Sequence, residues 1–106
     1  MSCETITQIV CDYFGVDIEA VKGRGRAQLI SVPRKIACYM MRQVLPISYE
    51  DIGTWMGLRD HSTIMYCVRD VEKRAKSSTM MQLHLRAIEL LMQEQHAGLQ
   101  PETANA

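Results

Sequence analysis

Apolar residues at the start of the chain recur at spacings of three and four, the period of a helix with one buried face. These residues are Ile6, Ile9, Val10 and Tyr13. We predict a helix over residues 5–14 with Gly15 as its terminator. A short second helix over residues 18–22 follows, with Asp17 as its cap. The next segment, residues 23–26, is Gly-Arg-Gly-Arg, and its two glycines predict a flexible, basic connector.

A longer helical pattern occupies residues 31–45. Its apolar stripe consists of Ile36, Ala37, Met40, Met41 and Val44. Ser31 is the expected N-cap, and Pro33 is tolerated in the first turn because the N–H groups there have no partner inside the helix. Pro46 ends the helix.

Two further helices are predicted after this proline. Ser48 caps the first, which is short because Gly57 ends it. The second runs from about His61 to Lys76 with Asp60 as its cap, and its inward-facing residues are Ile64, Cys67, Val68 and Val71. Two helices joined by a few residues that include glycine match a helix-turn-helix, which we place at about residues 48–75.

A last helix is expected over residues 79–97, with Thr79 and Gln82 forming a capping box. Its apolar residues cover more than one stripe, so it contacts more than one surface. Two interpretations remain open: the helix packs across its own domain, or it forms a surface for a homodimer or another protein partner. Residues 99–106 are predicted to be a flexible tail, which leaves residues 1–98 as a single helical domain.

Composition supports an all-α domain. The chain has 106 residues, the size of one domain, and its eight methionines against one Phe and one Trp favour a core of packed helices. The four cysteines form no CxxC pair, and no run of residues fits a signal peptide or a membrane span. We therefore expect a reduced, cytoplasmic protein without membrane contact.

The charges are balanced overall but segregated along the chain. Twelve basic and twelve acidic residues give a net charge of zero, which by itself argues against a nucleic-acid binder. However, residues 1–19 carry four acids and no base, whereas residues 20–49 carry six bases and no acid. One face of the molecule is therefore expected to be positive.

The candidate chemistry lies at the start of the second motif helix, in the run Arg59-Asp60-His61-Ser62-Thr63. A recognition helix projects short polar side chains from its first turn toward base edges and phosphates, and these residue types suit both. A plainer interpretation is that Asp60 and Ser62 only cap the helix and that His61 is an ordinary surface residue.

Three blocks of sequence make the interpretation more specific: Val32-Pro33-Arg34-Lys35-Ile36-Ala37-Cys38-Tyr39-Met40, Ser48-Tyr49-Glu50-Asp51-Ile52-Gly53 and Gly57-Leu58-Arg59-Asp60-His61-Ser62-Thr63-Ile64. In this order and spacing they resemble the C-terminal DNA-binding domain (domain IV) of the bacterial replication initiator DnaA, over about Ile6 to Arg74. The resemblance implies a compact, Trp repressor-like helical domain that recognises a nonameric duplex, the DnaA box.

The resemblance also implies roles for individual residues. Arg26 matches an arginine that enters the minor groove, Arg34 one that contacts bases or backbone, and Arg42 a phosphate contact. The expected major-groove residues are Asp60, His61, Ser62 and Thr63. Lys35, Ser48, Tyr49 and Arg59 complete the expected DNA-binding set. The chain departs from the family pattern at Lys35 (usually glutamine), Leu58 (usually glycine) and Ser62 (usually threonine).

Other activities lack a motif. No GxxxxGK[ST] loop occurs, and the histidines and cysteines do not have zinc-site spacings, so we expect no nucleotide, metal, cofactor or enzymatic activity. The leading hypothesis is a sequence-specific binder of double-stranded DNA in the bacterial nucleoid, which regulates replication initiation or transcription without an ATPase. The alternative is a protein-interaction module that uses residues 79–97.

Overall fold

The computed structural model describes residues 1–57 and 59–98, and every regular element in that part of the chain is an α-helix. The described helices are α1 (Cys3–Phe14), α2 (Ile18–Lys22), α3 (Gln28–Val44), α4 (Tyr49–Trp55), α5 (His61–Ala75) and α6 (Thr79–Gly98). The predicted all-α class is confirmed. The predicted tail over residues 99–106 lies outside the described residues.

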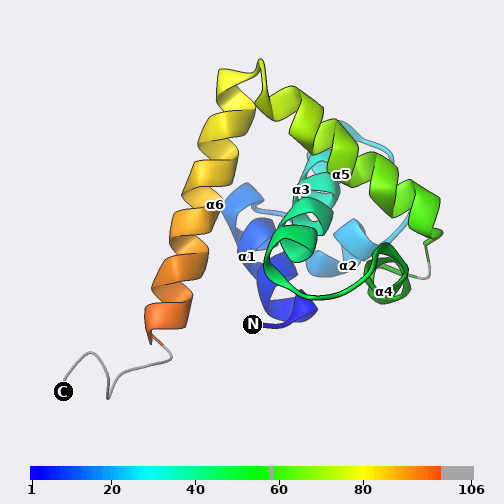
Figure 1. The fold of residues 1–106 in the computed structure, drawn as a ribbon, viewed down its shortest axis with the longest axis horizontal. Helices are drawn as coiled ribbons and strands as arrows, with labels where there is room; N and C mark the ends of the chain where they lie inside the picture. Colours follow the sequence, from blue (N-terminus) through cyan, green and yellow to red (C-terminus); the bar gives the residue numbers. More distant parts are fainter. Residues whose placement is uncertain (58, 99–106) are drawn as a thin grey trace.

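The long helix α3 is the centre of the arrangement and packs against α1, α2, α4 and α5. From the end of α5 the chain folds back, and α6 runs alongside α1 (Figure 1). The first turn of α5 lies beside α4, at the end of the molecule far from α6 (Figure 1). The last helix therefore does not cover the end of the helix-turn-helix that carries the candidate residues.

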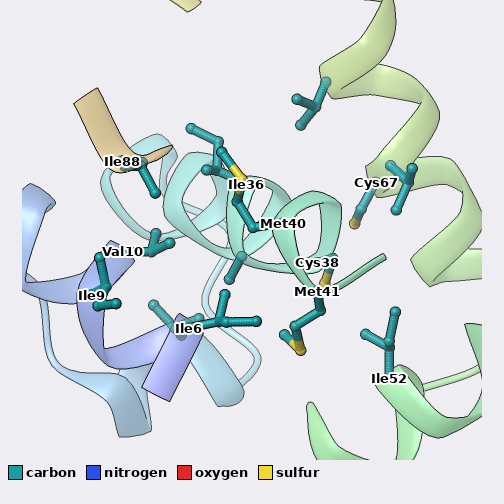
Figure 2. Packing of buried hydrophobic residues seen from close by; sticks show 14 of the residues in the cluster. Ile6, Ile9, Val10, Ile36, Cys38, Met40, Met41, Ile52, Cys67 and Ile88 are labelled. Carbon is teal, nitrogen blue, oxygen red and sulfur yellow. The ribbon is translucent and has the colours of Figure 1, made fainter. Parts of the chain in front are cut away.

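The core consists mainly of aliphatic and sulfur-containing side chains. Figure 2 shows that α3 lies in the middle of the core, with side chains that point toward Ile6 and Val10 of α1 and toward Cys67 of α5. Met40 and Met41 of α3 are essentially fully buried. Unbranched methionine fills irregular gaps between helices, which explains why a chain with so few aromatic residues closes a core.

Several predicted helix ends are confirmed. Gly15 adopts the left-handed conformation, with φ 71°, directly after α1. At the start of α4, the Ser48 hydroxyl accepts a hydrogen bond from the Asp51 N–H (3.1 Å), and the Asp51 carboxylate accepts one from the Ser48 N–H (3.2 Å). This reciprocal pair fixes where the helix-turn-helix begins.

The predicted start of α3 is wrong. The helix begins at Gln28, with Ala27 rather than Ser31 at the N-cap, so Pro33 lies inside the helix. Nothing in residues 28–32 breaks a helix, and a proline so near the start removes only one backbone hydrogen bond. The connector between α2 and α3 is consequently shorter than the sequence suggested.

The cap of α6 is displaced by one residue from the prediction. The Ser78 hydroxyl, not that of Thr79, accepts a hydrogen bond from the Met81 N–H, while Gln82 donates to the Ala75 carbonyl (2.7 Å). Within the described residues, no helix combines the length and apolar character needed to cross a membrane.

The turn between α4 and α5 depends on two glycines. A side chain at Gly53 would collide with the backbone carbonyl of Arg59, whose own N–H donates to the Gly53 carbonyl (2.8 Å). Gly57 has φ 95°, and a side chain there would lie 2.6 Å from the Lys22 carbonyl oxygen. The turn therefore folds closely onto α4 and onto the end of α2, as only glycine allows.

Candidate nucleic-acid interface

The first turn of α5 presents exposed polar side chains. His61, Ser62 and Thr63 are all exposed. Asp60 occupies the N-cap position without a side-chain capping bond, and its carboxylate instead lies 3.5 Å from Nδ1 of His61. The plainer interpretation of Asp60 as a capping side chain is therefore wrong in its chemistry, although the position is correct. The imidazole and the carboxylate both remain open to a ligand, at 50% and 69% exposure.

The polar surface continues along the outer face of α5. Ser62, Tyr66, Arg69 and Lys73 follow one another at spacings of four, three and four, opposite the buried stripe of the helix. Together with Met65 and Asp70 they line a shallow hollow. We call these four residues the outer ridge. The sequence analysis missed its last three members, although the period that located the buried stripe would also have located the opposite face.

Arg34 lies in the first half of α3 and is bound within the protein. Its side chain is buried, and its three nitrogens donate to backbone carbonyls at the end of α2 and in the connector: Nε to Val21 (2.6 Å), Nη1 to Gly25 (2.8 Å), and Nη2 to Gly23 (3.1 Å) and Ala20 (3.3 Å). The resemblance implies that this side chain contacts bases or the DNA backbone, whereas in the structure its guanidinium binds backbone carbonyls of the protein. The guanidinium is already occupied as a structural cap.

Arg59 joins this cap from the turn of the helix-turn-helix. Its guanidinium donates to the carbonyls of Lys22 (3.0 Å), Gly23 and Met56. The last carbonyls of a helix lack partners within it, and α2 has only five residues to hold its own shape. We call Arg34 and Arg59 the arginine pair. It replaces the missing donors and places positive charge at the negative end of the helix dipole.

Burial and mutual repulsion both disfavour two positive charges at this place. Burial lowers the pKa of the Arg34 guanidinium, and the neighbouring charge of Arg59 lowers it further. The carbonyl oxygens offset this cost, because hydrogen bonds to charged donors are stronger than neutral ones. The two like charges are therefore held together only while the carbonyls surround them.

The connector between α2 and α3 is bound to the protein through its backbone, while its basic side chains are exposed. The Gly25 carbonyl is bound by Arg34, whereas the side chains of Arg24 and Arg26 are exposed. The predicted flexible connector is thus fixed to the same structure that holds the turn before α5. Arg26, a predicted DNA-binding residue, projects from a defined position.

Lys35 is also paired within the protein. Its ammonium lies 2.9 Å from the Asp70 carboxylate and 5.2 Å from the ring centre of Tyr66, and Arg74 approaches the same carboxylate at 3.2 Å. Lys35, which the resemblance places in the DNA-binding set, thus has protein partners in the structure. Burial alone would raise the pKa of Asp70, but the hydrogen bond from Lys35 and the charges of Lys35 and Arg74 outweigh it, so the pKa lies below its usual value.

The remaining predicted residues meet where α3 ends and α4 begins. The Arg42 guanidinium donates to the Ile47 carbonyl (2.7 Å) and lies 4.4 Å from the ring centre of Tyr49. Ser48 follows as the exposed cap of α4. This group presents a cation, a hydroxyl and an aromatic ring, the set of side chains that contacts phosphates beside a recognition helix.

The sequence is similar to known bacterial proteins. A family described as the bacterial dnaA protein helix-turn-helix matches residues 3–71. The chromosomal replication initiator protein DnaA of Chloroflexus aurantiacus is 34% identical over 88 residues, which are 83% of this chain and 18% of that protein. The protein of the same name from Thermus thermophilus is 35% identical over 83 residues, covering 78% and 19%. The one from Magnetococcus marinus is 31% identical over 94 residues, covering 89% and 21%. The chain thus spans about a fifth of the length of these relatives.

Replacing Arg34 by lysine is expected to destabilise the fold by about 2–3 kcal/mol, because one ammonium cannot bind four carbonyls, and those of Val21 and its partly buried neighbours lose a donor. The measurement is the free energy of unfolding in urea. Arg26→Lys is the matched control, and it should change stability by less than about 0.5 kcal/mol because the side chain is exposed. Equal stability of the two variants would show that the carbonyl contacts contribute nothing.

Asp70 should make stability depend on pH in the acid range. Because its folded-state pKa is depressed, its contribution is complete above the unfolded pKa of about 4 and is lost as pH falls through the folded value. The difference in unfolding free energy between wild type and Asp70→Asn should therefore be largest near neutral pH and shrink below about pH 4. In a Lys35→Gln background the difference at neutral pH should be smaller. A difference that stays constant from neutral to acid pH would contradict the assignment.

Proposed function

The chain belongs to the bacterial DnaA helix-turn-helix family, as the sequence predicted, and on this premise we propose that it binds double-stranded DNA at a site resembling a DnaA box. One observation carries the proposal. The exposed polar first turn of α5 and the exposed arginines of the connector are held by the same arginine pair. Two DNA-contacting elements with a fixed relation suit a single duplex site better than two independent contacts would.

In the proposed complex, the first turn of α5 enters the major groove. His61 contacts a base edge, Ser62 and Thr63 contact bases or phosphate oxygens, and the Thr63 methyl can meet a thymine methyl. Asp60 has two available roles: it accepts from a cytosine amino group, or it orients His61 through their contact. The backbone N–H groups at the start of the helix attract a phosphate.

The connector supplies the second contact. Arg26 enters the neighbouring minor groove, where a narrow groove concentrates negative potential, and Arg24 is a further cation on the same segment. Arg42, Ser48 and Tyr49 contact the phosphate backbone at the start of α4. Arg34, Lys35 and Arg59 act indirectly in this proposal, because their side chains bind protein groups.

We further propose that this binding requires no nucleotide, because the chain has no GxxxxGK[ST] loop. The biological outcome would be occupation of initiator-type sites in a cytoplasmic, nucleoid-associated setting. Such occupation regulates replication initiation, by competition with a full-length initiator, or regulates transcription from a promoter that contains such a site.

A second candidate function rests on the outer surface of α6. Its inner face packs in the core, but Met80, Leu83, Leu90 and Leu91 are large apolar side chains that remain exposed. Exposed apolar side chains on one helix suit a homodimer or a protein partner. Such an interface and DNA binding at α5 are compatible, since the two surfaces lie at different ends of α5 (Figure 1).

The purified chain should enrich a short common sequence from a pool of random duplexes, without added nucleotide. Its affinity for the enriched duplex should fall roughly tenfold or more between 50 and 200 mM salt, because phosphate contacts release counterions. The affinity should be unchanged by ATP. Enrichment of no sequence, together with no retention of any duplex at low salt, would refute the proposed function.

His61→Ala should weaken binding to the enriched duplex by about 1–3 kcal/mol while leaving a scrambled duplex nearly unaffected, because a lost base contact removes specificity. Arg42→Ala is the matched control. It should weaken both duplexes alike, because a phosphate contact carries no sequence information. Affinities measured by titration of labelled duplexes compare the two. An equal loss on matched and scrambled duplexes for the His61 variant would exclude base readout by this side chain.

A further inference from the structure

Tyr66 is an unusual residue for the solvent-exposed face of a helix. It lies in the middle of the outer ridge, 62% exposed, between Ser62 one turn before it and Arg69 one turn after it. None of the contacts described for α5 buries its ring in the core. A large aromatic side chain left in water at this place gains more by contact with a ligand than a small polar one would.

The protein restrains this ring on one side. The Lys35 ammonium lies 5.2 Å from the ring centre, and Lys35 is itself held by Asp70 at 2.9 Å. A cation over an aromatic face is attracted by the ring. The restraint reduces the conformational freedom that the tyrosine would lose on binding a ligand.

The surroundings of the ring are compatible with a phosphate-rich ligand. Asp70 is the acidic residue in the hollow, and its charge is opposed by Lys35 and Arg74. Arg69 and Lys73 continue the ridge as exposed cations. The ring therefore lies in a positive strip that begins at the proposed reading turn of α5.

We infer that Tyr66 reads a thymine methyl group in the major groove, beyond the base pairs contacted by residues 61–63. This inference rests on the proposed function and extends its set of reading residues. Four residues of helix advance the side chain by about 6 Å, and stacked base pairs are about 3.4 Å apart. With α5 lying along the groove, as the inference requires, the ring reaches base pairs about one or two steps farther than Ser62. There the thymine C5-methyl is the apolar group that an aromatic edge can contact.

The test removes the methyl from the DNA and the ring from the protein, separately and together. Each thymine of the enriched duplex is replaced in turn by deoxyuridine, which lacks only the methyl. Wild type should lose roughly three- to fivefold in affinity at the position that Tyr66 contacts, the amount expected for one buried methyl, and should show a separate loss at the thymine met by Thr63. Tyr66→Ala should bind the unmodified duplex more weakly by a similar or larger factor and show no further loss at that position. Tyr66→Phe should behave like wild type, because the contact uses the ring rather than the hydroxyl.

Two controls make the assignment specific. Tyr39→Phe changes a half-buried tyrosine of α3 that lies near Glu72 and Glu89, and it should leave the deoxyuridine profile unchanged. Thr63→Ser removes the other methyl proposed to meet a thymine, and it should abolish sensitivity at a different position. Circular dichroism of Tyr66→Ala should show an unchanged fold, since the side chain contributes little to the core.

The outcomes separate the inference from the proposed function. Binding of a selected duplex in which no thymine is coupled to Tyr66 overturns the inference and leaves the proposed function standing. A loss in Tyr66→Phe as large as in Tyr66→Ala also overturns it, because the contact would then belong to the hydroxyl. If wild type selects and binds no duplex, the proposed function fails, and the inference fails with it.

Discussion

The open carbonyls at the end of α2 are the constraint on which the rest of the arrangement depends. A helix of five residues leaves nearly all its C-terminal carbonyls without partners. Arg34 reaches them from the central helix and Arg59 reaches them from the turn before α5. Three separate segments of the chain thus share one set of hydrogen bonds, and none of them can shift without breaking bonds to these carbonyls. A similar joint made of apolar contacts would tolerate sliding, whereas the directional donors of a guanidinium do not.

The arginine pair also fixes the connector, whose two glycines would otherwise leave it flexible and for which we propose a role in recognition. Flexibility allows an arginine to follow a groove, but a wholly mobile segment loses much of its binding energy to ordering. Here the carbonyl of Gly25 is fixed while the side chains of Arg24 and Arg26 remain exposed. The entropy of ordering the connector backbone is therefore largely lost when the protein folds, and only the side chains of Arg24 and Arg26 remain to be ordered on binding. The same joint fixes the turn that precedes His61, so that folding also sets the relation between the two proposed contacts.

Much of the fold was predictable because its determinants are local. The apolar period of α1, the reciprocal Ser48 and Asp51 cap and the glycine after α4 involve residues within a few positions of one another. The arginine pair was not predictable in this way. Arg34 binds carbonyls 9 to 14 residues earlier in the chain, and Arg59 binds carbonyls up to 37 residues earlier. A basic residue beside a DNA-binding motif has the same sequence signature whether it faces a phosphate or a backbone carbonyl, so only the three-dimensional structure distinguishes the two roles. The prediction of where α3 starts failed for a different reason. Ser31 and Pro33 are typical of a helix start, but the residues before them also tolerate a helix, so the helix begins earlier.

The two helices of the motif differ at their N-termini in a way that matches the division of work proposed for them. At α4, a complete capping box satisfies the N–H groups of Ser48 and Asp51 with side chains of the protein. At α5, the N-cap carboxylate makes no such bond and lies near the neighbouring imidazole instead. A complete capping box stabilises this short helix, and the phosphate contacts proposed at its start come from side chains rather than from capped N–H groups. An unfinished cap costs some stability but leaves N–H groups and the positive helix end available to a phosphate. In the proposed complex, a phosphate of the duplex would accept the hydrogen bonds that the α5 cap does not make. The packing of α5 against α3 holds the helix in place without DNA.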